Sequence, residues 1–377
     1  MKFALVHDWL RVNAGSEKVV GEILETYQRD NITIYTLFNY LPTEDRKKIL
    51  ANRPVKTSLL QYFPGVSRNY RYLLPLMPSF IRSFYLKEYD FILSSSHAVA
   101  KGFRRDRSIP HICYCHTPMR YAWDLYQDYS NDSHSIKSFM YRLFIRYIRN
   151  WDARSAGNVD YFLANSENVR QRILNNYKRD ATVLYPPVRV DMFALNEAPR
   201  ADFYLCVGRF VPYKKIDVII NAFRQLPEQQ LILIGDGYGA GKISKLLKGM
   251  KNVTWLGYKN DEELIRYMQQ AKACIFAAKE DFGIMCVETQ ACGTPVIALN
   301  NGGYKETVIE NVTGYLFDEQ QEHSIADAIR KFEANPLQDH RAIRKNAERF
   351  SSEIFRNGLK SFIDKQTKAF KQGKENG

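Results

Sequence analysis

The sequence has no long apolar run. No stretch approaches the roughly 18 uncharged apolar residues that a transmembrane helix needs, so no membrane-spanning helix is expected. Residues 1–8 hold only a short apolar run before His7 and Asp8, which predicts a first strand and not a signal peptide. We therefore expect a cytoplasmic protein.

Cysteine is scarce and unpaired in the sequence. The six cysteines form no CxxC pair and lie mostly within apolar segments. Cys113 and Cys115, followed by His116, could in principle bind a metal ion, but thiols at alternate strand positions are more often packing residues. We expect reduced, structural cysteines.

Two common nucleotide motifs are incomplete. Gly241-Lys242 is followed by Ile243 where a phosphate-binding loop needs Ser or Thr, which excludes that class of NTPase. Asp281-Phe282-Gly283 matches a kinase tripeptide, but the kinase catalytic loop is absent.

The charge is strongly positive and unevenly distributed. The chain has 377 residues, enough for two domains, and a net charge of +13. Residues 1–190 hold 28 Lys and Arg against 17 Asp and Glu, and the remainder is nearly neutral. A basic half favours phosphate-bearing partners: nucleic acid, an anionic bilayer or an anionic acceptor. The aromatic, Arg-containing segment 69–86 fits a membrane interface or a helical hairpin with inward-facing aromatics, and both interpretations stay open.

Short apolar runs alternate with helix-like segments, the pattern of parallel strands covered on both faces. Strands are predicted at residues 3–7, 32–38, 91–94, 111–115, 161–164 and 182–185, and again at 203–208, 231–235, 253–257, 273–277 and 295–298. Helices are predicted most clearly at residues 16–27, 136–155, 166–175 and 352–370.

We expect an α/β fold of two Rossmann-like, doubly wound domains that face each other across a cleft. Residues 185–188 include two prolines and form a rigid break. The first domain is predicted to span residues 1–187, with residues 355–377 packed back on it, and the second to span residues 188–354. Ligands of such sheets bind beyond the carboxyl ends of the strands.

In the second half, the predicted strand ends carry charged residues and glycines. Arg209 and Lys214 follow the first strand and would neutralise a diphosphate. Glu280 and Glu288 lie eight positions apart after the fourth strand, with hydroxyl-binding carboxylates as one interpretation and solvated or capping carboxylates as the other. The remaining candidates are backbone groups at Phe282, Gly283 and Ile284, the turn at Gly237, and Tyr258 as a wall for a nucleobase.

In the first half, the candidates are fewer. Gly15 and Ser16 open a helix after the first strand, which favours an anion. His116 ends a strand and is followed by Pro118 and Arg120, which favours a role in the cleft over a core position. His97 also ends a strand and is a weaker acceptor candidate.

Taken together, these motifs resemble the retaining glycosyltransferases of the GT-B fold, family 4, over nearly the entire length. The resemblance lies in the Glu-x7-Glu motif at 280–288, the Gly-Arg-x-x-Pro-x-Lys segment at 208–214 and the Gly-Asp-Gly loop at 235–237. Residues 7–9 and 115–121 are similar to bacterial polysaccharide mannosyltransferases. This family often has Gly-Gly where this sequence has Ala14-Gly15, and often has Gly where this sequence has Lys215. The acceptor side is therefore the part of the site for which the resemblance says least.

The resemblance implies a role for individual residues. Arg209 and Lys214 would hold the donor diphosphate, Glu280 the donor-sugar hydroxyls and Glu288 the ribose. His116 would contact the donor sugar. Backbone groups at Phe282, Gly283 and Ile284 would meet the sugar and phosphates, and Gly15 would lie near the diphosphate and acceptor.

The implied reaction is transfer of a hexose without cofactor or metal, with retention of configuration. GDP-mannose is the expected donor, with a UDP-sugar as the alternative. The expected acceptor is a glycan or lipid-linked glycan of a bacterial polysaccharide, met at the cytoplasmic face of the inner membrane through the basic first domain.

Two other classes remain open. Gly235-x-Gly237-x-x-Ala240, with Asp261 further on, fits a nicotinamide-dependent dehydrogenase. Arg142, Arg146 and Arg149 at helical spacing fit a nucleic acid as well as a bilayer surface, although we expect no nucleic-acid partner.

Overall fold

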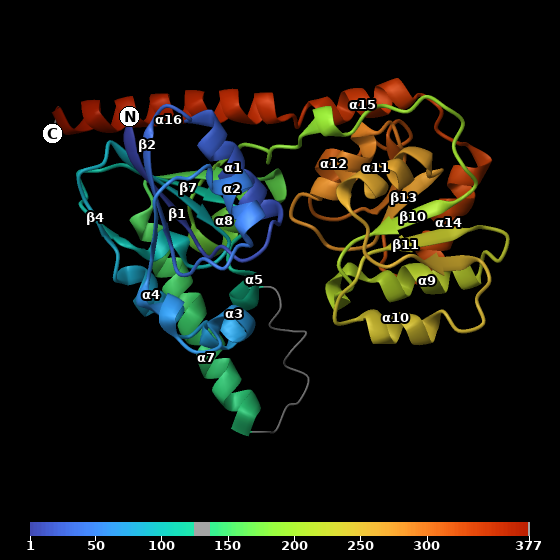
Figure 1. The fold of residues 1–377 in the computed structure, drawn as a ribbon, viewed down its shortest axis with the longest axis horizontal. Coiled ribbons are helices and arrows are strands. Elements are labelled where there is room, and N and C mark those ends of the chain that lie inside the picture. Colours follow the sequence, from blue (N-terminus) through green and yellow to red (C-terminus); the bar gives the residue numbers. More distant parts are fainter. Residues whose placement is uncertain (124–135, 376–377) are drawn as a thin grey trace. The chain divides into compact units, whose positions relative to one another are not determined.

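The computed structural model describes residues 1–123 and 136–375, without the side chains of residues 121, 136–141, 374 and 375. The chain divides into two compact units (Figure 1). Unit 1 comprises Met1–Pro187 and Phe355–Gly377, and unit 2 comprises Val188–Ile354. None of the described helices is both long enough and apolar enough to cross a membrane.

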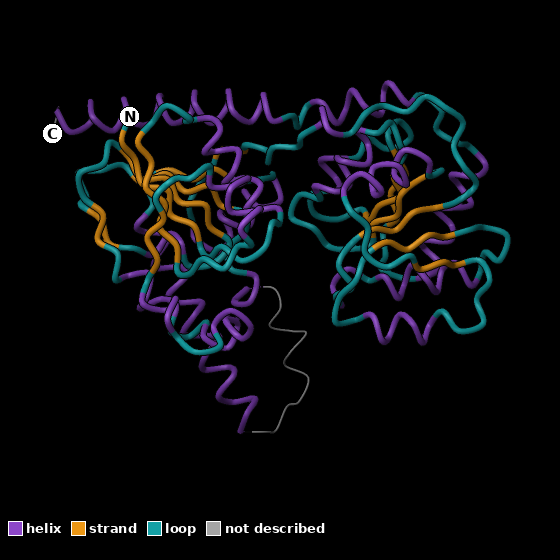
Figure 2. Tube along the Cα trace, viewed as in Figure 1, coloured by secondary structure: helices purple, strands orange, loops and turns teal. Residues whose placement is uncertain are grey.

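Unit 1 is built on a parallel sheet, which in the described residues has seven strands in the order β3-β2-β1-β5-β7-β8-β9. The strands are β1 (Lys2–His7), β2 (Asn31–Thr36), β3 (Val55–Thr57), β5 (Phe91–Ser96), β7 (His111–Cys115), β8 (Tyr161–Ala164) and β9 (Thr182–Val183). A separate pair joins β4 (Tyr85–Leu86) to β6 (Arg104–Arg105). In Figure 2 the strands run through the middle of each unit, with helices around them.

The helices of unit 1 connect and cover this sheet. They are α1 (Gly15–Thr26), α2 (Thr43–Leu50), α3 (Val66–Asn69), α4 (Met77–Arg82), α5 (Arg120–Trp123), α7 (Ile136–Ser155), α8 (Glu167–Tyr177) and α16 (Ser352–Glu375). Short 3-10 turns are η1 (Leu59–Tyr62), η2 (Tyr70–Leu73), η3 (Ala100–Gly102) and η4 (Ala156–Asn158).

Alternation along β1 divides the core of unit 1 between two faces of the sheet. Phe3 and Leu5 belong to one apolar cluster, which also holds residues of α1 and the side chains of Phe355, Leu359 and Ile363 from α16. Ala4 and Val6 belong to another, which holds residues of α4 and α7. The period of two in a strand explains the division, and it shows why the last helix is part of unit 1.

Unit 2 repeats the arrangement with a parallel sheet, six-stranded in the described chain, in the order β12-β11-β10-β13-β14-β15. Its strands are β10 (Tyr204–Val207), β11 (Leu231–Ile234), β12 (Val253–Trp255), β13 (Ala273–Phe276), β14 (Val296–Leu299) and β15 (Gly314–Phe317). Its helices are α9 (Ile216–Arg224), α10 (Ala240–Leu246), α11 (Asp261–Gln270), α12 (Ile284–Ala291), α13 (Tyr304–Thr307), α14 (Glu322–Ala334) and α15 (His340–Glu348), with turns η5 (Val190–Met192) and η6 (Pro212–Lys214).

The predicted class, an α/β fold of two parallel-sheet domains, is confirmed. The segment 69–86 is partly buried and partly exposed. Met77 and Ile81 are fully buried in the core of unit 1, whereas Tyr72 is 84% exposed. The six cysteines are all buried free thiols.

Candidate functional site

The strand order of unit 2 creates a switch point between β10 and β13. Chain connections run outward from β10 to β11 and β12 on one side, and from β13 to β14 and β15 on the other. Arg209 follows β10 and Glu280 follows β13. At such a switch point the adjacent strand ends leave room for a ligand, so these two residues lie where a ligand is expected.

Lys214 and Glu280 form an ion pair at this edge, although they are far apart in sequence. The Nζ of Lys214 lies 2.5 Å from Oε1 of Glu280, and each side chain is about one-fifth exposed. Burial alone would lower the pKa of Lys214, but the charge of Glu280 raises it above its ordinary value. Lys214 therefore stays protonated next to Glu280. Arg209, five positions earlier in the sequence, adds an exposed guanidinium.

Helix α12 presents its N-terminus at the same strand end. The cap residue is Gly283, with φ +88°, and no side chain caps the helix. The first N–H groups of a helix lack acceptors within it and carry partial positive charge, which suits an anion. The preceding Phe282 is buried against Phe350, while Glu288 lies one turn into α12 and is 6% exposed.

Close backbone packing holds the Glu280 loop in place. The N–H of Gly303 donates to the carbonyl oxygen of Glu280 at 2.9 Å. A Cβ on Gly302, whose φ is +62°, would lie 2.2 Å from that oxygen. The residues after β14 therefore have to be glycines for the carboxylate loop to adopt this position.

The glycines after β11 have a similar structural explanation. A Cβ on Gly235 would lie 1.9 Å from the carbonyl oxygen of Gly208, and one on Gly237 would lie 2.7 Å from that of Phe210. The loops after β10 and β11 thus lie directly against each other. This packing accounts for the glycine pattern without a nicotinamide cofactor. Tyr258, beyond β12, is 77% exposed.

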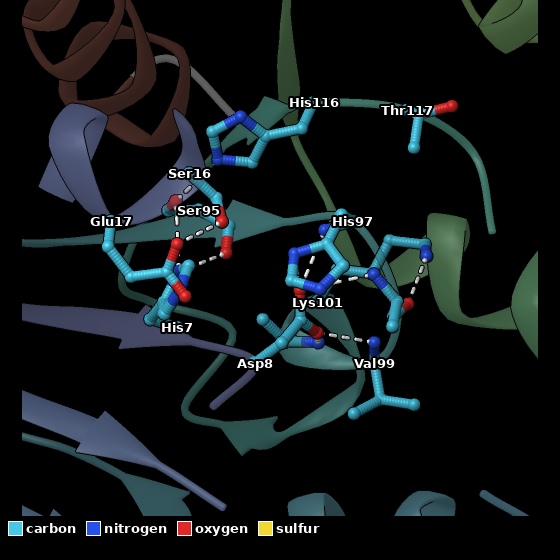
Figure 3. A network of polar contacts seen from close by, with 12 residues as sticks. His7, Asp8, Ser16, Glu17, Ser95, His97, Val99, Lys101, His116 and Thr117 are labelled. Atoms are coloured by element: carbon cyan, nitrogen blue, oxygen red, sulfur yellow. Dashed lines mark hydrogen bonds and ion pairs between the residues drawn. The ribbon is translucent and has the colours of Figure 1, made fainter. Parts of the chain in front are cut away.

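Unit 1 has its own switch point, between β1 and β5, and polar residues gather there (Figure 3). His7 ends β1, Ser95 lies near the end of β5, and His116 follows β7. Nδ1 of His7 lies 3.1 Å from both the carbonyl oxygen and Oγ of Ser95. Oγ of Ser95 lies 2.8 Å from Nε2 of His116, which links the three side chains.

The geometry shows which atoms of His7, Ser95 and His116 carry the hydrogens of this hydrogen-bond network. A carbonyl oxygen only accepts, so Nδ1 of His7 must carry hydrogen and donate to Ser95. The hydroxyl of Ser95 then donates to Nε2 of His116. The pKa of His116 is well below its ordinary value because of burial and the neighbouring His97 and His7. His116 is therefore neutral and protonated on Nδ1, which can donate to a ligand.

Glu17 lies behind His7. Its Oε1 is 4.0 Å from Nε2 of His7, and Oγ of Ser16 donates to its Oε2 at 2.8 Å. Burial alone would lower the pKa of His7, yet the carboxylate of Glu17 raises it. Burial alone would raise the pKa of Glu17, yet His7 lowers it. The two form a buried pair whose charges stabilise each other.

Asp8 has a structural role at the same edge. Its carboxylate accepts four backbone N–H groups, from residues 97–100, at 2.5–3.1 Å. Nδ1 of His97 also lies 3.0 Å from Asp8, and burial lowers the pKa of His97. Lys101 is directed into the core, where its Nζ lies 2.5 Å from Asp152. Asp8 therefore fixes the chain after β5 and holds His97 in place.

The structure brings together some of the predicted residues and separates others. His116 and His97 share one edge of unit 1, with ring centroids 6.3 Å apart, and Gly15 and Ser16 begin α1 beside them. Arg120 begins the short helix α5. Arg209, Lys214, Glu280 and the start of α12 form the set in unit 2.

Sequence reasoning missed Glu17 and Ser95, and used His7 only for its resemblance. Each is a polar residue at the end of an apolar strand or the start of the next helix. Their convergence depends on β1 pairing with β5, whose residues are separated by 88 positions. Among the described residues, no cluster of three or more His, Cys, Asp or Glu has a geometry that could hold a metal ion.

Known structures share the fold of the entire chain. HepE from Anabaena, solved in complex with UDP, matches with a TM-score of 0.70 and 17% identity over 97% of this chain and 100% of that one. Sucrose-phosphate synthase from Thermosynechococcus elongatus matches with a TM-score of 0.72 and 18% identity, over 98% and 100%. These similarities define the fold as that of GT-B glycosyltransferases.

Two family models match adjoining parts of the chain, each over less than half of its length. Residues 14–192 match the model of the family described as Glycosyltransferase Family 4, and residues 188–350 match that of Glycosyl transferases group 1. Each half of the chain is thus similar to a glycosyltransferase domain.

Curated relatives match over a shorter range. An uncharacterized glycosyltransferase of Methanocaldococcus jannaschii is 28% identical over 52% of this chain and 56% of its own length. A D-inositol 3-phosphate glycosyltransferase of Mycolicibacterium smegmatis is 29% identical over 51% of this chain and 50% of its own. The chain thus spans about half the length of the curated relatives it matches.

Proposed function

We propose that the protein is an enzyme that transfers a hexose from a nucleotide-sugar to a glycan or lipid-linked glycan, with retention of anomeric configuration. The family matches and the shared fold support glycosyl transfer. The observation that carries the proposal is the Lys214–Glu280 pair, 2.5 Å long, at the switch point of unit 2 beside the uncapped N-terminus of α12.

In this proposal unit 2 binds the donor. Arg209 and Lys214 neutralise the charge that develops on the diphosphate as its bond to the sugar breaks. The first N–H groups of α12 bind the same anion. Glu280 accepts hydrogen bonds from sugar hydroxyls, and Glu288 accepts them from the ribose. These cations and dipoles do the work that a metal ion does in other transferases.

Unit 1 binds the acceptor and contacts the sugar. Nδ1–H of His116 donates to an oxygen of the transferred sugar, and its neutral state avoids placing a second charge near the anomeric carbon. No side chain of the set is assigned as a nucleophile. The leaving phosphate oxygen therefore takes the proton of the acceptor hydroxyl as that hydroxyl attacks from the same face.

Two donors are supported by different observations. The similarity of residues 7–9 and 115–121 to polysaccharide mannosyltransferases favours GDP-mannose and a role in bacterial polysaccharide synthesis. The shared fold with HepE, solved with UDP and with UDP-glucose, favours a UDP-sugar. Thermal unfolding with GDP-, UDP- and ADP-sugars would decide, because only the true donor raises the melting temperature strongly at micromolar concentration.

The test of the site is Glu280→Ala, which removes hydroxyl acceptors and the partner of Lys214. Transfer should fall by roughly two orders of magnitude or more, as for loss of a group used in the transition state. Glu262→Ala is the control, because that carboxylate is 87% exposed on α11 of the same unit. A Glu280→Ala enzyme as active as the control would contradict the assignment of Glu280 to the donor site.

We further propose that an anionic membrane surface is a partner of unit 1. Tyr62 and Tyr72 are 78% and 84% exposed, in a segment with the exposed Arg68 and Arg71. Exposed aromatics with Arg suit the interface of a bilayer. Tyr62→Ser with Tyr72→Ser should weaken sedimentation with phosphatidylglycerol vesicles, and unchanged sedimentation would count against the proposal.

A further inference from the structure

A basic pocket lies in unit 1, at the edge of the sheet opposite to His116. It has a volume of about 780 Å³, and its walls include the end of α4, both short strands β4 and β6, the end of α7 and the turn η4. Strands β7 and β8 begin after β6 and η4 respectively, so the pocket lies at the amino ends of these strands. The hydrogen-bond network of His7, Ser95 and His116 lies at the carboxyl ends of the strands of this sheet.

The charged residues that line this pocket are arginines. Of the described lining residues, none is Asp or Glu and five are arginines: Arg82, Arg104, Arg105, Arg107 and Arg154. Arg105 is already neutralised, because its buried guanidinium lies 2.8 Å from Asp160. The guanidiniums of Arg82 and Arg154 are exposed and, within the described part of the chain, make neither an ion pair nor a hydrogen bond.

Other lining residues are held firmly. Nε of Arg104 donates to the carbonyl oxygen of Arg82 at 2.9 Å, and its guanidinium lies 5.8 Å from the ring centroid of Tyr85. Trp151 lies so close to Gly102 that a Cβ there would be 2.4 Å from the indole ring. Nη1 of Arg107 donates to the carbonyl oxygen of Gly157 at 3.3 Å. The pocket is thus a shaped site with fixed walls.

The chemistry points to a phosphate-bearing ligand. Guanidinium groups bind phosphate through two parallel N–H bonds, and aromatic rings beside them contact the remainder of a ligand. A volume of about 780 Å³ lies within the range of ligand sites. We propose that this pocket binds a phosphate ester through Arg82, Arg104 and Arg154, separately from the donor site of unit 2. The ester is either the headgroup of an anionic lipid or part of a soluble molecule.

The experiment compares two double variants of the chain of 377 residues. Arg82→Gln with Arg154→Gln removes the two unpaired guanidiniums of the pocket. Arg29→Gln with Arg189→Gln removes two exposed arginines elsewhere, and matches the change in net charge. Both should keep the wild-type melting temperature, because all four side chains are exposed. Each protein is titrated with inorganic diphosphate by calorimetry, and sedimented with vesicles of phosphatidylglycerol or phosphatidylcholine.

In the first arm, the wild type and the control should show one more diphosphate site than the pocket variant. Neither variant alters the proposed donor site. Any diphosphate that binds there therefore adds the same number of sites to both variants and leaves the difference between them unchanged. Such a difference identifies a soluble phosphate ester as sufficient. If only binding to phosphatidylglycerol vesicles separates the variants, by at least tenfold, the ligand is a lipid headgroup. Equal behaviour of the two variants in both arms overturns the proposal.

Discussion

Ser95 connects His7 to His116, so it should set the proton position on His116. Ser95→Ala removes the hydroxyl that donates to Nε2 of His116 at 2.8 Å. Because that bond favours the neutral ring, the pKa of His116 should rise. We expect the acidic limb of the pH–rate profile to move to higher pH, and activity to fall by about tenfold, in line with a loss of about 1–1.5 kcal/mol from one hydrogen bond.

The neighbouring serine offers a matched control for this prediction. Oγ of Ser96 is buried and has no hydrogen-bond partner among the residues that the structure describes. Ser96→Ala should therefore leave the pH profile unchanged, and should not destabilise the protein. Nitrogen NMR of the histidine rings would report the tautomer directly. A profile that is the same in both alanine variants would contradict the assigned hydrogen-bond direction.

Glu17 and His7 should make stability depend on pH. The folded pKa of His7 is raised above 6.5, so its contribution is complete below 6.5 and is lost as pH rises through the folded value. The folded pKa of Glu17 is lowered below 4.5, so its contribution is present above 4.5 and is lost as pH falls through the folded value. The pair is strongest between these two ordinary values.

Glu17→Gln tests this dependence. The substitution keeps the shape but removes the charge that holds the proton on His7. We expect the free energy of unfolding to fall by roughly 1–3 kcal/mol near pH 5.5, and by less near pH 8.5. Urea unfolding at both pH values measures the difference. An equal loss at both would mean that His7 is not the linked group.

The candidate site was only partly predictable from individual residues. Arg209, Lys214 and Glu280 were placed at strand ends from the chain pattern. The contact of Lys214 with Glu280 was not predicted, because it depends on the pairing of β10 with β13, which local sequence does not determine. The network of unit 1 was harder to find. Glu17 looks like an ordinary acidic residue in the first turn of a helix, and its partner His7 comes from the preceding strand.

The loop that carries Glu280 depends on its neighbour after β14. Gly302→Ala would place a methyl group 2.2 Å from the carbonyl oxygen of Glu280, at a φ of +62° that alanine disfavours. The loop must move, so we expect a loss of more than about 1 kcal/mol in stability and a larger loss of transfer. Denaturant unfolding and initial rates would measure both.

Gly241→Ala is the control for that substitution. Gly241 lies in α10, and a Cβ there would meet nothing within 4 Å. Alanine should stabilise the helix by up to about 1 kcal/mol and leave transfer intact. If the two glycine variants were equally active, the packing of residue 302 on the Glu280 loop would have no part in function.

Most strands of the two sheets were predicted from their apolar runs, whereas two strands at sheet edges were missed. The strand 161–164 and the helix 136–155 were predicted with the bounds that the structure shows. Strand β3 has three residues with a lysine at its centre, and β15 begins at Gly314 and lies at the sheet edge. Both depend on pairing with a neighbouring strand, and pairing is a tertiary property that local sequence does not contain.

The last helix makes the N-terminal and C-terminal ends of the chain parts of one folding unit. Leu359 is fully buried in the cluster that contains Phe3 and Leu5. Leu359→Ala should therefore cost about 2–5 kcal/mol in unit 1, because the cavity would open in a core formed by both ends. Unit 2, which ends at Ile354, contributes nothing to this cluster. Calorimetry should show one transition at lower temperature and another unchanged, if the units unfold separately.

Lys360→Ala is the matched substitution on the same helix, at an exposed position. It should leave both transitions within about 0.5 kcal/mol of the wild type, because surface changes rarely cost more. A Leu359→Ala protein that unfolds like Lys360→Ala would show that residues 355–377 do not stabilise unit 1. A lowered transition would show instead that a segment that follows unit 2 in sequence stabilises unit 1. Unit 2 would then draw its stability from one continuous segment, whereas unit 1 would draw part of its stability from the last helix.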